Sequence, residues 1–281
     1  MSRNIPKLTS LKTETKFRAR LDELGIQLPL SSTAPVDILS RPLSLRDGVA
    51  GNRQVGNRFA ILPMEGWDAT VDGRPTELVR RRWRRFGESG AKLIWCEATA
   101  VRSDGRANAN QLLLDSGGTG PLGDLRRELV EAHQARFGRT DDLVVGLQLT
   151  HSGRWARPDG TPHPRTAFVH PWLDRRVNAD ETSVFSDDEL SELTKDYVAA
   201  TVRARDAGFD FVDVKHCHGY LLHELLATQG REGEYGGTMS GRTRFLREVV
   251  SGIRKAAPEL HIAVRLSAFD FAPFRMGEDG T

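Results

Sequence analysis

The sequence predicts an α/β protein in which a parallel sheet is built from repeated strand–helix units, as in a TIM (β/α)8-type barrel. Apolar, β-branched segments alternate with helical segments five times between residues 58 and 268. Such alternation makes a parallel sheet, because each crossover helix returns the chain to the same edge. Polar side chains that buried strands rarely tolerate, such as Glu97, Gln148 and Arg265, gather where the strands end. In a barrel these ends form one rim, and the loops there build the active site.

A doubly wound sheet would also place its site at the C-terminal ends of its strands. However, the segment after the first strand, LPMEGWDA, contains one glycine, Gly66, and lacks the G-x-G-x-x-G turn of dinucleotide-binding sheets. A barrel is therefore favoured, with about five of its eight βα units. We expect an N-terminal leader, residues 1–55, that wraps the barrel, and a partial (β/α) barrel domain, residues 56–281.

An incomplete barrel would expose two sheet edges and an apolar interior. We therefore expect the chain to be a fragment or a truncated reading frame, with a self-sufficient protein as the alternative. Glycine-rich residues 276–281, MGEDGT, are expected to begin an active-site loop.

The first βα unit begins with a short apolar strand at residues 58–64. A helix is predicted at residues 76–90, with Thr76 as the N-cap because its hydroxyl can accept from a free N–H of the first turn. Helical spacing places four side chains on its inward face. These are Leu78, Val79, Trp83 and Phe86.

The later elements follow the same alternation. Ser186 begins a helix with a capping box, because Glu189 follows three residues later. The further predicted strands are residues 91–101, 143–151, 209–215 and 261–268. The further predicted helices are residues 122–138, in which Leu125, Leu129 and Phe137 carry the apolar face, and a helix pair within residues 221–255.

Composition narrows the class of protein. Of the 281 residues, 38% are hydrophobic and 28% charged, which suits a soluble globular chain, and a net charge of +2 gives no reason to expect nucleic acid or a membrane as partner. Two cysteines, Cys96 and Cys217, cannot form a disulfide framework, so we expect a reduced, cytoplasmic protein. The expected partner is a small-molecule substrate, and a homo-oligomer is left open.

Two side chains at strand ends are candidates for ligand binding. Gln148 can donate and accept at once, so it can bind the amide edge of a heterocycle, or a neighbouring backbone group satisfies it instead. Arg265 lies within an apolar strand and must find a partner or face a ligand. Beside a flavin it would stabilise the negative charge of the reduced ring, whereas the alternative is an ion pair with Glu97 or Asp213.

The stretch FVDVKHCHGYLLHELL changes from an apolar strand into a helix through a polar turn. Tyr220 is a good proton donor if it is held over a substrate, and His218 or Lys215 can hydrogen-bond an electron-withdrawing oxygen. Two alternatives are that the histidines are structural, or that His216, Cys217 and His218 bind a metal. A third fixed ligand is not apparent, so we expect no metal.

Six motifs occur here in the order seen in old yellow enzyme-like NADH:flavin oxidoreductases, and the chain resembles that family over roughly residues 40–270. The motifs are NRFAILPM (57–64), LIWCEATAV with DGR (93–106), QLTHSGR (148–154), GFDFVDVKHCHGYLLHELL (208–226), EYGG with RTRFLREVV (234–250), and VRLSA (264–268). The resemblance implies a (β/α)8 barrel that binds FMN at its rim and reduces activated alkenes with NADH or NADPH. In the family the last strands also supply the FMN phosphate site.

The resemblance also implies roles for individual residues. Pro63, Met64 and Glu65 would contact the isoalloxazine ring mostly through their backbone, Ala98 would lie against the ring, Gln148 would bind its pyrimidine edge, and Arg265 would lie near N1. Trp67 would line the substrate pocket. Tyr220 would protonate the substrate after hydride arrives from flavin N5.

Two positions depart from the family pattern. Glu65 stands where other members often have Thr or Cys. Lys215 and His218 occupy the places of a His pair, or a His and Asn pair, three residues apart. A lysine ammonium would still donate to a carbonyl or nitro oxygen, and it would equally favour a carboxylate or acyl substrate. The alternatives are a barrel lyase or aldolase with Lys215 as Schiff-base nucleophile, or an inactive truncated fragment that acts as a binding module.

Overall fold

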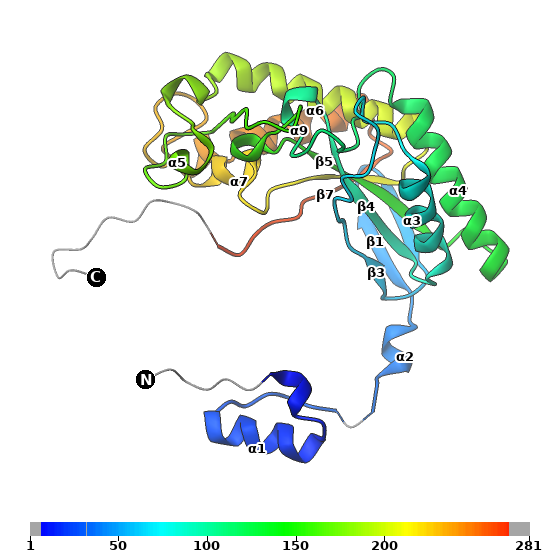
Figure 1. Ribbon diagram of the computed structural model, residues 1–281. Helices are drawn as coiled ribbons and strands as arrows, with labels where there is room; N and C mark the ends of the chain where they lie inside the picture. The colour runs from blue at the N-terminus through cyan, green and yellow to red at the C-terminus, as the bar shows by residue number, and fades with distance from the viewer. Residues whose placement is uncertain (1–6, 32, 270–281) are drawn as a thin grey trace. The chain divides into compact units, whose positions relative to one another are not determined.

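The chain divides into two compact units, Met1–Ser40 and Arg41–Thr281, in a computed structural model that describes residues 7–31 and 33–269 (Figure 1). The first unit contains η1 (Leu8–Ser10), α1 (Glu14–Leu24) and α2 (Val36–Leu39). A leader of residues 1–55 that wraps the barrel stays a prediction.

The second unit begins with an antiparallel hairpin, β1 (Leu43–Asp47) and β2 (Gly51–Val55). Val55 is buried and packs in one apolar cluster with Val144 and Phe211 of the main sheet. The sequence analysis did not anticipate these strands. Most of their side chains are polar and at least partly exposed, so they carry little of the alternation that marks a half-buried strand.

Five parallel strands form the main sheet in chain order, β3–β4–β5–β6–β7. Their bounds are β3 Ala60–Ile61, β4 Leu93–Ala100, β5 Val144–Thr150, β6 Phe211–Val214 and β7 His261–Ala263. Each of the five predicted strands overlaps one of these. Sequential parallel order is what consecutive βα units of a barrel produce, and it places the carboxyl ends of all five strands at one edge.

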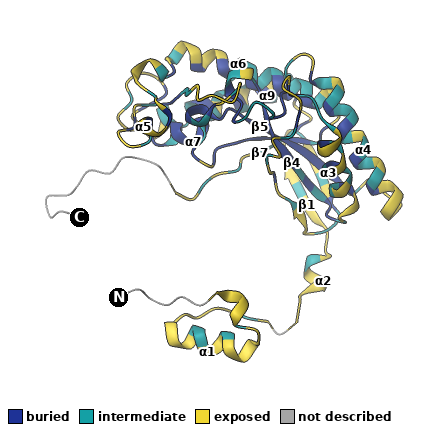
Figure 2. Cartoon of the chain, in the orientation of Figure 1, coloured by how far each residue is buried: buried dark blue, intermediate teal, exposed yellow. Residues whose placement is uncertain are grey.

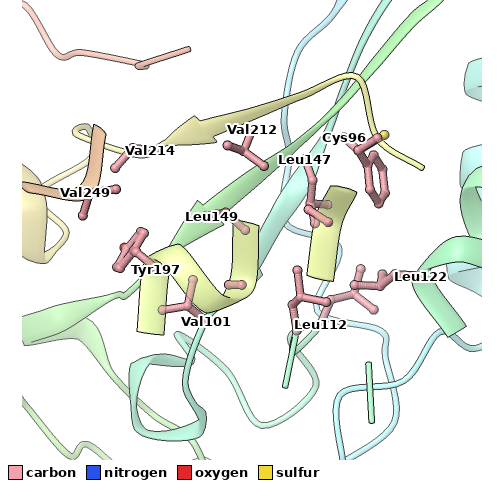
Figure 3. Packing of buried hydrophobic residues seen from close by; sticks show 14 of the residues in the cluster. Cys96, Val101, Leu112, Leu122, Leu147, Leu149, Tyr197, Val212, Val214 and Val249 are labelled. Carbon is pink, nitrogen blue, oxygen red and sulfur yellow. The ribbon is translucent and has the colours of Figure 1, made fainter. Parts of the chain in front are cut away.

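Helices α3, α4, α6 and α9 pack on one face of this sheet (Figure 1). The helical segments of the second unit are α3 Glu77–Glu88, η2 Ser103–Gly105, α4 Thr119–Phe137, η3 Gly153–Trp155, α5 Asp174–Val177, η4 Glu181–Ser183, α6 Asp187–Asp206, α7 Leu221–Leu226, α8 Met239–Arg242 and α9 Arg244–Ala256. Burial concentrates on the strands and on the helix sides that meet them (Figure 2). Figure 3 shows Leu147 and Val212 of the strands in one apolar cluster with Leu122 of α4 and Tyr197 of α6.

The opposite face of the sheet carries the smaller apolar cluster, the one that contains Val55, Val144 and Phe211. Trp95 and Phe211 meet edge to face with ring centroids 5.1 Å apart. Gly146 lies between their strands, and a Cβ at this position would come within 2.2 Å of the Phe211 ring. The next row toward the carboxyl ends aligns Ala98, Gln148 and Asp213 across β4, β5 and β6. The interior face thus changes from apolar to polar at the height where a site is expected.

The helix starts are predicted better than the helix faces. The Ser186 capping box is confirmed, with the Glu189 N–H donating to Ser186 Oγ at 3.2 Å. Thr76 does occupy the N-cap of α3, but its hydroxyl donates to the Asp68 carbonyl and accepts no bond from the helix. Leu78 and Phe137 were wrongly placed inward, since they are 51% and 40% exposed. Both lie near a helix end, where the row of side chains that packs against the sheet begins or stops.

The described residues provide neither a site for a metal ion nor a membrane-spanning helix. Within residues 7–31 and 33–269, no group of three His, Cys, Asp or Glu side chains is placed to hold a metal ion. No helix in those ranges is long and apolar enough to cross a membrane. Residues 276–281, expected to begin an active-site loop, lie outside the described part of the chain.

Candidate active site

Three side chains converge on the carboxylate of Glu65, in the loop after β3. Lys215 Nζ, after β6, lies 2.6 Å from Oε1. The Tyr220 hydroxyl and the Trp67 indole N–H both donate to Oε2 at 2.9 Å. The two segments that the sequence analysis singled out, LPMEGW and KHCHGY, therefore meet at one carboxylate.

Lys215 also lies against the Tyr220 ring, with Nζ 3.9 Å from the ring centroid. The lysine is 2% exposed, so little water reaches its charge. The Glu65 carboxylate and the face of the Tyr220 ring compensate that charge instead. Burial and the adjacent Glu65 carboxylate raise the pKa of Tyr220 above its ordinary value. The phenol therefore keeps its proton at neutral pH. Lys215 Nζ, which a Schiff-base lyase would need free, is held in this ion pair.

The polar turn after β6 breaks the strand as predicted. His218 has a φ of +65° and Gly219 a φ of +68°, both in the left-handed region. Partial burial and the neighbouring Lys215 lower the pKa of His218, so its ring is a neutral donor at pH 7. His216 is fully buried, its Nδ1 lies 2.8 Å from the Val214 carbonyl, and burial lowers its pKa to about 4. These contacts fit a structural role for His216.

A pocket of about 340 Å³ opens beside this cluster. Three of the predicted site residues line it: Trp67, His218 and Tyr220. Its other lining residues are Ala107, Asn108, Trp155 and Arg157, which the sequence analysis did not identify. They come from loops after β4 and β5, where no periodic pattern marks a functional position. Lys215 is not among the residues that line the pocket.

The residues for which the resemblance implies contact with flavin lie at the carboxyl ends of neighbouring strands, on the sheet face opposite the helices. Ala98 and Gln148 are paired across β4 and β5, and both are buried. Gln148 Nε2 donates to Asp213 Oδ2 at 2.5 Å, and the backbone N–H of Arg265 donates to Asp213 Oδ1 at 2.7 Å. Burial raises the pKa of Asp213. The side chain of Asp213 thus fixes two predicted flavin ligands.

Arg265 makes neither ion pair that was considered for it. Its Nη1 donates to the Pro63 carbonyl at 3.3 Å, the one hydrogen bond that its guanidinium makes with described residues. The carboxylate of Glu97 instead accepts from Arg82, from the Trp83 indole and from the Gly66 N–H. This network ties the loop that carries Glu65 to β4 and α3.

These residues fit a flat heterocycle with one polar edge. Ala98, with its small side chain, lies beside Gln148, and Gln148 Oε1 accepts no hydrogen bond from the described residues. Arg265 has five N–H donors and uses one of them, so it can still face an electron-rich ring edge. Met64 is 73% exposed beside them, which leaves apolar surface for a ring to cover. The donor and acceptor set matches the pyrimidine side of an isoalloxazine.

Comparison with known proteins identifies the family of the chain. A model of the NADH:flavin oxidoreductase / NADH oxidase family matches residues 49–278. The chain is 30% identical over 229 residues to an NADPH dehydrogenase of Bacillus cytotoxicus, which covers 79% of this chain and 61% of that protein.

Solved structures show the same likeness. The old yellow enzyme of Pichia sp. AKU4542 aligns with a TM-score of 0.67 and 25% identity, over 90% of this chain and 64% of that one. Morphinone reductase in complex with tetrahydroNAD aligns with a TM-score of 0.61 and 25% identity, over 81% and 63%. These neighbours confirm the partial TIM-barrel fold, and the chain spans about three fifths of the length of the proteins it matches. The chain belongs to the NADH:flavin oxidoreductase / NADH oxidase family.

Proposed function

We propose that this chain carries the substrate-facing part of an FMN-dependent NAD(P)H oxidoreductase that reduces an activated alkene, with Tyr220 as the proton donor. The observation that carries the proposal is the position of the Tyr220 hydroxyl. Tyr220 lines the same pocket as His218 and Trp67, its hydroxyl donates to Glu65, and Gln148 and Arg265 lie at neighbouring strand ends. A reaction needs a proton donor and a cofactor edge within reach of one substrate.

When bound, FMN supplies hydride chemistry between a reduced nicotinamide and an electron-poor double bond. Arg265 and Gln148 would hold the polar edge of the ring, and Ala98 and Met64 would contact it. The chain's own residues then have three tasks: to orient the substrate, to polarise it and to deliver a proton.

Polarisation is assigned to His218, whose neutral ring donates an N–H to the electron-withdrawing oxygen. Proton delivery is assigned to Tyr220, whose raised pKa keeps the phenol protonated until a carbanion-like carbon takes the proton. Lys215 lies against the ring of Tyr220, where its positive charge offsets part of the repulsion between the Glu65 carboxylate and the phenolate that would form. Glu65 holds both groups in place.

The test begins with an absorbance spectrum of the 281-residue chain after incubation with FMN and desalting. We expect retained flavin colour that NADPH or NADH bleaches in the absence of oxygen. Arg265→Met should weaken flavin retention, whereas Arg81→Met, an exposed position on α3, should not. Equal retention in both variants would count against the assigned flavin edge.

The proton donor is tested with Tyr220→Phe in the loaded chain. Flavin bleaching by NADPH should persist, because that step needs no proton from Tyr220, whereas reoxidation by an alkene should slow by roughly 10²-fold or more. A lyase predicts a different result: borohydride with a carbonyl substrate would trap a covalent adduct on Lys215. Such an adduct would overturn the proposal.

A further inference from the structure

Among the described residues that line the pocket, Arg157 is the one arginine or lysine. Among the residues that the structure describes, its guanidinium has no hydrogen-bond or ion-pair partner. The nearby basic groups are committed elsewhere. Lys215 is paired with Glu65, and the Arg106 guanidinium donates to backbone carbonyls, including that of Pro158 at 2.9 Å.

The backbone around Arg157 is fixed although its side chain is exposed. Its N–H donates to the Arg106 carbonyl at 2.8 Å, and the Arg106 side chain holds the next residue, Pro158. Two residues earlier, the Trp155 indole donates to the Gly219 carbonyl at 3.1 Å. The loop after β5 is thereby tied to the loop after β4 and to the turn after β6. The backbone of Arg157 therefore has a defined position beside the pocket.

The rest of the lining favours a flat ligand with a negative group. Trp67, Trp155 and Tyr220 supply aromatic surface, and none of the described residues that line the pocket is Asp or Glu. Asn108 Oδ1 accepts from the Asn110 N–H at 2.9 Å, which leaves the Asn108 amide N–H groups as donors. An arginine with adjacent N–H donors, free of competing carboxylates, recognises carboxylate and phosphate groups.

We propose that Arg157 is a specificity-determining residue that binds the anionic group, carboxylate or phosphate, of a planar conjugated ligand in this pocket. The inference rests on the proposed function, because it names the class of molecule that the same pocket accepts. The sequence suggested Lys215 as the cation that would prefer a carboxylate. Because Lys215 is paired with Glu65, Arg157 takes that role instead.

The anion has two potential sources, a carboxylate on the substrate and a phosphate on the nicotinamide nucleotide. Calorimetric titration of the flavin-free chain with four probes separates them. Trans-cinnamate is compared with cinnamamide, which has the same shape without charge. NADPH is compared with dihydronicotinamide riboside, which has the same ring without phosphate. Each titration is repeated with Arg157→Gln, Arg157→Lys and the control Arg81→Gln.

We expect the charged member of at least one pair to bind roughly tenfold more tightly than its neutral partner. Arg157→Gln should remove that preference, Arg157→Lys should keep part of it, and Arg81→Gln should leave it intact. Loss confined to cinnamate assigns the site to a substrate carboxylate, and loss confined to NADPH assigns it to a nucleotide phosphate. Equal binding of charged and neutral probes, no measurable binding, or equal loss in Arg81→Gln overturns the proposal. Because no readout involves flavin, failure of the flavin assignment is detected separately.

Discussion

Lys215 Nζ lies 2.6 Å from Oε1 of Glu65, a residue 150 positions earlier in the chain. The resemblance to old yellow enzyme-like proteins implies that both positions depart from the family pattern. Each departure alone would place an uncompensated charge beside the pocket, whereas together they form an ion pair. The cluster therefore depends on both residues at once.

Glu65→Gln should destabilise the chain by about 3 kcal/mol, because it leaves the buried Lys215 ammonium without its counter-charge. Lys215→Met should cost a similar amount by leaving the Glu65 carboxylate with hydrogen-bond donors but no cation. The double variant should recover most of the loss, since neither charge then remains buried. Urea unfolding of the four proteins measures the coupling.

An exposed pair provides the matched control for this cycle. Glu192 and Lys195 form an ion pair on α6 with both side chains more than 60% exposed. Glu192→Gln should change the free energy of unfolding by less than about 0.5 kcal/mol. If the losses of Glu65→Gln and Lys215→Met simply add in the double variant, the two residues are not coupled.

All three tyrosines of the chain should resist ionisation in the folded state. Burial raises the pKa of Tyr197 and Tyr220 well above the ordinary value of 10.0, and burial with the Glu248 hydrogen bond raises the pKa of Tyr235 to about 12. A phenolate difference spectrum should therefore stay silent through pH 10. The unfolded chain loses these protons first, so it binds fewer protons than the folded chain, and stability falls as pH rises above 10.

The variant Glu65→Gln tests whether the Glu65 carboxylate raises the pKa of Tyr220. Removal of the carboxylate should lower the pKa of Tyr220 alone, so one tyrosine of three should ionise earlier in the variant. Measurement of the phenolate amplitude, with chain integrity followed by circular dichroism, decides the point. A full three-tyrosine transition near pH 10 in the folded wild-type chain would contradict it.

The sequence predicts the strands well and the site only in part, for physical reasons. Apolar runs mark β4 and β5 because both faces of these strands are buried. The contact between Glu65 and Lys215 was not predicted, since both lie in irregular segments after strands, whose paths no periodicity constrains. Arg157 was not predicted for the same reason. From the sequence alone, an arginine in a loop cannot be distinguished from an ordinary solvated charge.

Gly146→Ala should destabilise the chain by about 1–3 kcal/mol, because the new methyl would overlap the Phe211 ring. The ring is held edge to face against Trp95, so it cannot move without breaking that contact. The control is Gly120→Ala in α4, where the added Cβ meets nothing within 4 Å and should stabilise by up to about 1 kcal/mol. Thermal unfolding of both variants gives the comparison. Equal effects would mean that the interior row is not tightly packed.

Arg154 is fully buried between two carboxylates. Its Nε lies 2.5 Å from Glu224 Oε1, its Nη1 donates to Asp174, and its Nη2 donates to the Phe168 carbonyl at 3.0 Å. The guanidinium thereby ties the loop after β5 to α7. Arg154→Met should destabilise the chain by about 3–5 kcal/mol at pH 7, since it leaves both carboxylates buried without a cation. Arg139→Met, which breaks an exposed pair, should change stability little.

The loss in Arg154→Met should shrink as the pH falls. Burial already raises the pKa of Glu224 above its ordinary value of 4.5, and removal of Arg154 takes away the charge that opposes this rise. Between the unfolded pKa and the raised folded pKa, the folded chain binds more protons, so its stability increases as pH decreases. Urea unfolding at pH 7 and near pH 5 should therefore show a smaller difference from wild type at the lower pH. A pH-independent difference would mean that Glu224 stays charged without its arginine, held by the Ala167 N–H and solvent that enters the loop.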